Sequence, residues 1–142
     1  MQVQELMTTR VVSVTQQEPV SAAAKLMKRH NLGALPVCGD DGRLRGVITD
    51  RDIAIRCVAA DLDPADTRVR EIMSRGITVC RSDDEVDDVL RAMGQAQVRR
   101  LPVTQDGKVV GILSISDLAK SSRFHMEAAE ALGEISSNIT RR

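Results

Sequence analysis

Two stretches of seven residues carry a glycine, a hydroxyl and a carboxylate in the same order, G-x-x-[T/S]-x-x-D, and they are Gly46–Asp52 and Gly111–Asp117. The glycine allows another backbone to approach closely, the hydroxyl of Thr49 or Ser114 lies beside a helix N-terminus, and the aspartate follows about one turn later. A hydroxyl beside exposed N–H groups suits a phosphate, whereas a carboxylate suits a vicinal diol such as ribose. The same residue types also make ordinary helix caps, so the motif by itself leaves both interpretations open.

The two stretches belong to an internal duplication. An offset of 66 residues lays Met7 on Met73 and Leu35-Pro36-Val37 on Leu101-Pro102-Val103. One residue fewer in the second Gly/Asp turn changes the offset to 65, which lays Asp52 on Asp117. A turn is the place where a chain tolerates a change of length best. The sequence therefore predicts two tandem copies of one unit.

Each copy is predicted to have the order β-α-β-β-α. Apolar residues three and four apart indicate the first helix of each copy, with Pro19 in the first turn of one and a Ser82–Glu85 capping box opening the other. An apolar segment, a Gly/Asp turn and a second apolar segment then indicate a hairpin. The predicted ranges are strands near 11–14 and 77–80, helices over 18–30 and 83–95, hairpins from 35 to 48 and around 106–107, and helical segments over 50–60 and 115–121.

Together these features resemble paired cystathionine-β-synthase (CBS) domains, the Bateman module. The resemblance rests on the duplication, the two LPV segments and the two G-x-x-[T/S]-x-x-D stretches, and it covers about residues 3–121. The segments GALPVCGDDGRL, ITDRDIAI and QVRRLPV are similar to short bacterial stand-alone CBS pairs of the hypoxic-response type. The resemblance implies an α/β fold with pseudo-twofold symmetry, a first repeat over 1–66, a second over 67–121 and a C-terminal amphipathic helix over 122–142.

The resemblance also implies a regulatory function without catalysis. Such a module binds an adenosyl ligand (AMP, ADP, ATP, NAD or S-adenosylmethionine) in a cleft between its repeats and needs no other cofactor. It passes occupancy to a protein target or to a second copy in a disc-like homodimer. The residues implied to bind the ligand are Thr49, Asp52, Ser114, Ser116, Asp117, Arg99, Arg100, Arg51, Val47, Ile112, Gly33, Ala34, Ser13 and Thr78.

The two copies differ in the residues just before LPV, which are Arg99-Arg100 in the second and Gly33-Ala34 in the first. Arg99 is the expected phosphate partner, and Arg100 points the other way on a strand. A solvated surface pair explains the same two residues. The expected walls of an adenine slot are also candidate core residues, and they are Val47, Ile48, Ile112, Leu113, Pro36 and Pro102.

Composition excludes several other functions. The 142 residues contain 20 Lys and Arg against 20 Asp and Glu, and no long basic block, which argues against nucleic acid or a membrane surface as partner. One Phe, with no Trp or Tyr, leaves no aromatic platform for stacking bases. No apolar run of about 18 residues and no leader pattern occur, so we expect a cytoplasmic protein.

Two alternatives to a sensor remain at this stage. An enzyme has little support, because two His and three Cys at wide spacing assemble no nucleophile with its base and no metal site. A structural interaction module, in which the motif residues are only caps, or a thiol- or metal-responsive stress protein using Cys38 and Cys80, stays open. The apolar stripe of the C-terminal helix is predicted to pack on its own module or on another chain, and it consists of Phe124, Ala128, Leu132, Ile135 and Ile139.

Overall fold

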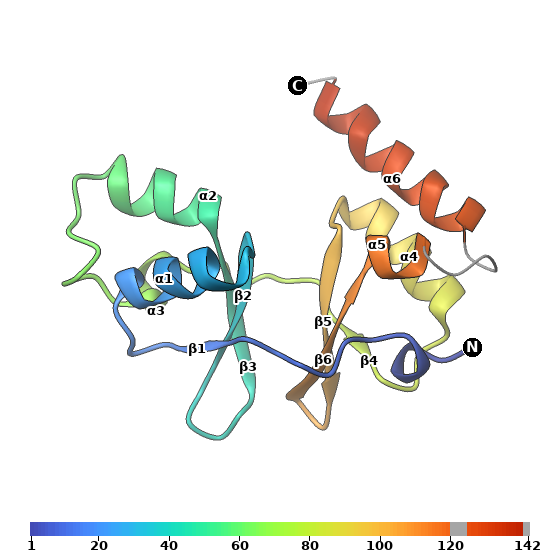
Figure 1. The fold of residues 1–142 in the computed structure, drawn as a ribbon, viewed down its shortest axis with the longest axis horizontal. Coiled ribbons are helices and arrows are strands. Elements are labelled where there is room, and N and C mark those ends of the chain that lie inside the picture. The colour runs from blue at the N-terminus through green and yellow to red at the C-terminus, as the bar shows by residue number, and fades with distance from the viewer. Residues whose placement is uncertain (120–124, 141–142) are drawn as a thin grey trace. The chain divides into compact units, whose positions relative to one another are not determined.

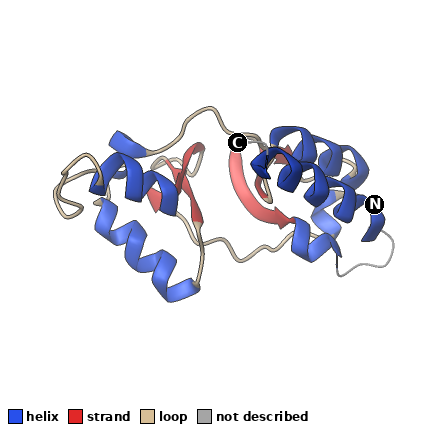
Figure 2. Ribbon diagram, turned by 90° about the horizontal axis from the view of Figure 1, so that it is seen from above, coloured by secondary structure: helices blue, strands red, loops and turns tan. Residues whose placement is uncertain are grey.

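The computed structural model describes residues 1–119 and 125–140, and the chain forms two compact units. Unit 1 contains Met1–Val11, Thr78–Asp106 and Val110–Arg142, and unit 2 contains Val12–Ile77 and Gly107–Val109. In each unit helices lie on one face of a three-stranded sheet (Figure 2). The predicted mixed α/β fold is confirmed. Each compact unit, however, combines segments from both sequence copies. The repeat boundaries at residues 66 and 121 stay a prediction.

Unit 2 has the sheet order β1-β2-β3 (Figure 1). Strand β1 (Val14–Thr15) pairs in parallel with β2 (Ala34–Cys38), and β2 pairs antiparallel with β3 (Leu44–Thr49). The predicted first hairpin is therefore confirmed. The helices of this unit are α1 (Val20–His30), α2 (Asp50–Asp52), the π-helix η2 (Ile53–Val58), which continues α2 without a break, and α3 (Val69–Ile72).

Unit 1 repeats this plan with the sheet order β4-β5-β6. Strand β4 (Cys80–Arg81) pairs in parallel with β5 (Arg100–Gln105), which is hydrogen-bonded to β6 (Lys108–Ser114). The helices of this unit are the 3₁₀ turn η1 (Val3–Glu5), α4 (Val86–Ala96), α5 (Ile115–Ala119) and α6 (His125–Thr140). Strands β1 and β4 begin later and are shorter than the sequence predicted.

Each unit is completed by the first residues of the other sequence copy. The Val86 N–H at the start of α4 donates to the Met1 carbonyl at 3.0 Å, and the Val20 N–H at the start of α1 donates to the Thr67 carbonyl at 2.8 Å. These bonds are equivalent under the 66-residue offset, and they satisfy N–H groups that helix starts otherwise leave unpaired. The duplication therefore extends to how each helix begins.

The predicted helix starts need two corrections. Helix α4 begins at Val86, three residues later than expected, and its N-cap Glu85 makes no side-chain cap, so the Ser82–Glu85 capping box is wrong. The backbone there pairs with the N-terminal segment instead, since the Ser82 carbonyl accepts from Gln4 N–H at 2.9 Å. Pro19 is the extended N-cap of α1, with φ −68° and ψ 151°, and is not in the first helical turn.

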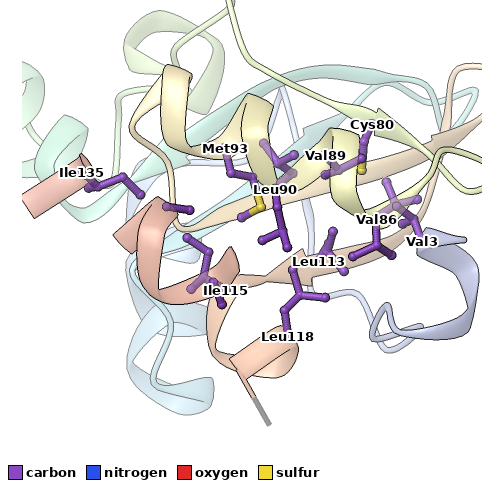
Figure 3. Close-up of a cluster of buried hydrophobic side chains, with 14 residues drawn as sticks. Val3, Cys80, Val86, Val89, Leu90, Met93, Leu113, Ile115, Leu118 and Ile135 are labelled. Carbon is purple, nitrogen blue, oxygen red and sulfur yellow. The ribbon is translucent and has the colours of Figure 1, made fainter. Parts of the chain in front are cut away.

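Unit 1 has an apolar core made by one face of its sheet, α4, α5 and α6 (Figure 3). Leu90, Met93, Leu113 and Leu118 are buried there, with at most 2% of each exposed. Helix α6 adds Ala128, Ala131 and Ile135 to the same core, so its packing on its own unit is confirmed.

The predicted apolar stripe of α6 is partly wrong. Leu132 is 39% exposed, and Ala131 takes the buried position instead. The reason is geometric, because positions 128, 131 and 135 span about 60° of the helix circumference and position 132 lies about 40° beyond position 128, outside that arc. Phe124 and the side chain of Ile139 lie outside the described residues.

Candidate functional site

In unit 2 the first motif forms a reciprocal helix cap. The Asp52 N–H donates to Thr49 Oγ1 at 3.0 Å, and Asp52 Oδ2 accepts from the Thr49 N–H at 3.0 Å. This capping box ends β3 and begins α2, so the cap interpretation of these two residues holds in the structure.

Asp52 also has two partners that the sequence analysis did not identify. The Ser74 hydroxyl lies 3.3 Å from Asp52 Oδ1 and 3.4 Å from Oδ2, and Arg56 Nε lies 3.8 Å from Oδ1. Arg56 Nη1 donates to the carbonyls of Ile72 and Met73 at 3.2 and 3.3 Å. Asp52 is 7% exposed, so its carboxylate is buried against the donors of Thr49, Ser74 and Arg56.

In unit 1 the second motif has a related but more open arrangement. The Asp117 N–H donates to Ser114 Oγ at 3.2 Å, and the hydroxyls of Ser114 and Ser116 lie 3.2 Å apart. Thr8 Oγ1 donates to Asp117 Oδ2 at 3.4 Å. Asp117 is half-buried, and Ser116 is exposed where the first motif has the exposed Arg51. Three hydroxyls and a carboxylate thus meet at the start of α5.

Thr8 and Ser74 lie on extended segments that pass close to the glycines of the two motifs. The Ser74 segment passes Gly46, and the Thr8 segment passes Gly111. Thr8 and Ile112 exchange two backbone hydrogen bonds of 2.9 Å, and Val47 and Ser74 do the same. A Cβ on Gly46 would lie 2.6 Å from the Ser74 carbonyl oxygen, and a Cβ on Gly111 would lie 3.0 Å from that of Thr8. Glycine is therefore required at both positions for close approach. The 66-residue offset, which aligns Thr8 with Ser74, was the available signal for this pair.

The residues before LPV lie beside the helix starts. The Ile115 N–H donates to the Arg99 carbonyl at 2.9 Å, and the Asp50 N–H donates to the Gly33 carbonyl at 2.9 Å. The structure therefore brings the Arg99 backbone next to the Ser114–Asp117 turn, with the Arg99 side chain exposed. Arg100 is also exposed and begins β5, where the first copy has the half-buried Ala34 at the start of β2.

The residues predicted to form the apolar walls of an adenine slot separate into two groups that differ in burial. Ile48 and Leu113 are 0% exposed and belong to the two cores, and Pro36 and Pro102 are buried as well. Their role in the structure is packing. Val47 and Ile112 are half-buried, and their backbones hold the Ser74 and Thr8 segments. Only this second pair lies beside the candidate site.

Ser13 and Thr78 precede the first strand of each unit. Among the described residues, the Asp52 side chain contacts Thr49, Ser74 and Arg56, and none of these is Ser13, Thr78 or Arg51. Ser13 acts on the Cys38 thiol instead and lowers its pKa, against the larger opposite effect of burial.

Comparison with known proteins identifies the family. A family model described as the CBS domain matches residues 3–58 and 69–123. This chain belongs to the CBS domain family. As a CBS pair it is 39% identical over 121 residues to Hypoxic response protein 1 of Mycobacterium tuberculosis, and the match covers 85% of each chain.

Two solved structures of CBS proteins are similar to this CBS pair. A crystal structure of Hypoxic Response Protein I with two coordinated zinc ions has a TM-score of 0.78 and 38% identity, covering 84% of this chain and 98% of that one. The CBS domain pair of protein MJ0100, in complex with 5′-methylthioadenosine and S-adenosyl-L-methionine, has a TM-score of 0.73 and 28% identity, covering 84% and 94%.

Of the three thiols of this CBS pair, those of Cys57 and Cys80 are buried and that of Cys38 is half-buried. Burial raises the pKa of the Cys80 thiol to about 12, with a smaller effect from the Asp84 carboxylate. Burial also raises the pKa of Cys38, partly offset by the bond from Ser13. Cys57 is buried and donates to the Leu62 carbonyl at 3.6 Å. Because the thiolate is the form that reacts and binds metals, the raised pKa values of Cys38 and Cys80 do not favour a thiol-based site at these two residues.

Within residues 1–119 and 125–140 of the CBS pair, no three His, Cys, Asp or Glu side chains gather in a way that could hold a metal ion. The same residues contain no helix of the length and apolarity needed to cross a membrane.

Proposed function

We propose that this CBS pair is a sensor that binds an adenosyl ligand and transmits its presence to a protein partner. The observation that carries the proposal is the meeting of Asp117, Ser114 and Thr8 at the start of α5, beside Arg99. A carboxylate accepts from the two hydroxyls of a ribose, and hydroxyls next to a helix start donate to a phosphate. The proposed ligands are AMP, ADP, ATP, NAD and S-adenosylmethionine.

Arg99 supplies the charge that a phosphorylated ligand needs. A guanidinium binds phosphate through two parallel N–H donors and stays charged at every physiological pH. Arg99 has an exposed side chain, and its carbonyl is bonded to the first residue of α5. Ser116 and Arg100 are proposed as further polar contacts, while Thr78 and Ile112 are proposed for the base. The equivalent residues of unit 2, with Gly33 and Ala34 at the arginine positions, lack that charge.

The complex of the MJ0100 CBS pair with two adenosyl compounds supports this ligand class. Since that pair is 28% identical to this one, the support is for the class and not for one compound. A sensor also needs a partner whose contact differs between the free and bound states. We propose a second copy of this chain as one such partner, because Ile55 and Val58 on η2 are 55% and 60% exposed.

Two measurements test the proposed function. Mass spectrometry of small molecules released from the natively purified protein should detect an adenosyl compound. The five candidate ligands, each at millimolar concentration, should include at least one that raises the melting temperature, because ligands that bind only the folded state stabilise it. Inorganic phosphate at the same ionic strength is the control. If no adenosyl compound is released and none shifts the melting temperature, the protein is not an adenosyl sensor.

A further inference from the structure

Helix α6 covers one flank of α4 in unit 1. Gly94 is buried on that flank, and a Cβ on it would lie 2.6 Å from Glu134 Oε2 and 3.5 Å from the Ala131 Cα. Leu90, one turn earlier on the same flank, is 2% exposed. Glycine at position 94 therefore allows α6 to lie close against α4.

The same flank of α1 in unit 2 is open. Under the 66-residue offset the buried Gly94 aligns with Lys28, which is exposed, and Leu90 aligns with Ala24, which is half-buried. The first copy is followed by residues 59–68, which form turns and extended backbone where α6 follows the second copy. Unit 2 therefore exposes a surface whose equivalent in unit 1 is covered.

The exposed surface of unit 2 is basic and partly apolar. Helix α1 contains three Lys or Arg and no Asp or Glu, and these three side chains, Lys25, Lys28 and Arg29, are all exposed. Helices α1 and η2 pack on the same core (Figure 1), and on η2 Ile55 and Val58 are 55% and 60% exposed. We call these five residues the basic surface. Its chemistry fits an acidic partner that also has apolar side chains.

Unit 1 carries the opposite charge where α4 and α6 meet. Helix α6 contains three Glu and no Lys or Arg, and Glu130 and Glu134 are exposed. Asp87, also exposed, lies two turns before the buried glycine of α4 and so on the flank that α6 covers. The one Arg of α4, Arg91, forms an ion pair with Asp88. We call Asp87, Glu130 and Glu134 the acidic seam.

We propose that the basic surface of unit 2 binds the acidic seam of unit 1 in a second copy of this chain. This inference rests on the proposed function, in which a second copy receives the signal, and it names the two surfaces that meet. Contact between two basic surfaces places like charges together and is disfavoured. Leu132 of α6, which is 39% exposed, gives Ile55 and Val58 an apolar counterpart in the second copy.

Reciprocal charge reversal, followed by sedimentation velocity, tests this contact. Lys25→Glu/Lys28→Glu reverses the charge of the basic surface, and Asp87→Lys/Glu130→Lys reverses that of the acidic seam. Each double variant alone should self-associate at least about tenfold more weakly than the wild type, because like charges then face each other. An equimolar mixture of the two should associate again, since each reversed surface then meets one of opposite charge.

Arg45→Glu/Arg75→Glu is the matched control. It makes the same change of charge on exposed residues of unit 2 outside α1 and η2, and it should associate like the wild type. Three results overturn the inference. They are a wild-type chain that is monomeric at every concentration used, reversed variants that associate like the wild type, and an equimolar mixture of folded variants that stays monomeric.

Cross-linking gives a second readout that needs no variant and decides the question if a reversed variant does not fold. A carbodiimide joins a lysine amine to a carboxylate that lies next to it. In an equilibrated mixture of isotope-labelled and unlabelled wild type, peptides that join Lys25 or Lys28 to Glu130 or Glu134 should combine both isotopes. The absence of such peptides, or peptides of a single isotope only, contradicts contact between copies.

The outcome for this contact is separable from that for the ligand. The reversed variants leave the residues proposed to bind AMP unchanged, so each folded variant should still bind any adenosyl ligand that binds the wild type. If ligands bind and the mixture stays monomeric, only this inference fails. If no adenosyl ligand binds while the mixture associates, the proposed function fails and the contact between copies remains.

Discussion

The two units have the same topology but use their aligned aspartates differently. In unit 2, Asp52 is buried between the Thr49 N–H, Ser74 and Arg56, whereas in unit 1 the half-buried Asp117 lies with Ser114, Ser116 and Thr8 near Arg99. Both motifs keep the glycine, the capping hydroxyl and the aspartate. The residues around a motif, and not the motif itself, therefore separate a structural cap from a candidate binding site.

The largest expected effects concern what the units share. Ile48 and Leu113 are aligned and 0% exposed, so Ile48→Ala and Leu113→Ala should each lower the free energy of unfolding by about 2–5 kcal/mol in urea titrations. Neither should change AMP affinity in the fraction that stays folded. A loss of stability below about 1 kcal/mol together with lost AMP binding would mean that these residues line a ligand site instead.

The next largest effect concerns the positive charge of Arg99, which unit 2 lacks at the aligned Gly33. Arg99→Ala should weaken AMP binding by about 10–100-fold and leave adenosine nearly unchanged, because a charge-assisted hydrogen bond to phosphate is lost. The AMP effect should shrink at high salt. Calorimetry with both ligands measures the difference.

Gly33→Ala is the matched control for Arg99→Ala. Its Cβ would lie 3.2 Å from Asp50 Oδ2, so any effect is steric and should be equal for AMP and adenosine. Equal losses for the two ligands in Arg99→Ala would place its side chain outside the phosphate site.

A smaller effect is the difference between the two aspartates in their contribution to the free energy of unfolding. Asp52→Ala should lower the free energy of unfolding by about 1–3 kcal/mol, since the Thr49 N–H and the Ser74 hydroxyl lose a buried acceptor. Asp117→Ala should cost less, because Asp117 is half-buried and its donor Thr8 is exposed. Chemical denaturation of both variants gives the comparison, and a larger loss in Asp117→Ala would reverse the assignment of the structural aspartate.

The smallest effect near neutral pH concerns the Cys80 thiol. Its pKa of about 12 in the folded chain is above the value near 8.5 expected when unfolded, so the folded state holds more protons between these values. The free energy of unfolding should therefore fall as pH rises through this window, and Cys80→Ala should remove that part of the slope. Iodoacetamide at pH 8, followed by peptide mass spectrometry, should label Cys80 only after denaturation; rapid labelling in the native protein would contradict its buried, protonated state.

Much of the fold could be predicted from the sequence because local patterns determine it. Apolar spacing indicated α1 and α4, and the LPV segments with their Gly/Asp turns indicated the hairpins. The start of α4 was misplaced because its cap residues compete with a distant segment, residues 1–4, for the same backbone groups. Such competition has no signature in a local window.

The candidate site could be predicted only in part. The capping hydroxyls and aspartates were found because they lie within one motif. Ser74 and Thr8 reach them from 22 and 109 residues away in sequence, so their partnership depends on which segment completes which unit. Arg56 is only one turn beyond Asp52, but its bonds to the Ile72 and Met73 carbonyls required the fold. Contacts between distant segments were therefore the missing part.

A crystal structure of the protein grown with AMP tests the assignment of the two aspartates most directly. We expect the ribose hydroxyls within hydrogen-bond distance of the Asp117 carboxylate and the phosphate near Arg99, while Asp52 keeps its contacts with Ser74 and Arg56. AMP bound at Asp52, or AMP bound with its ribose away from Asp117, would contradict it.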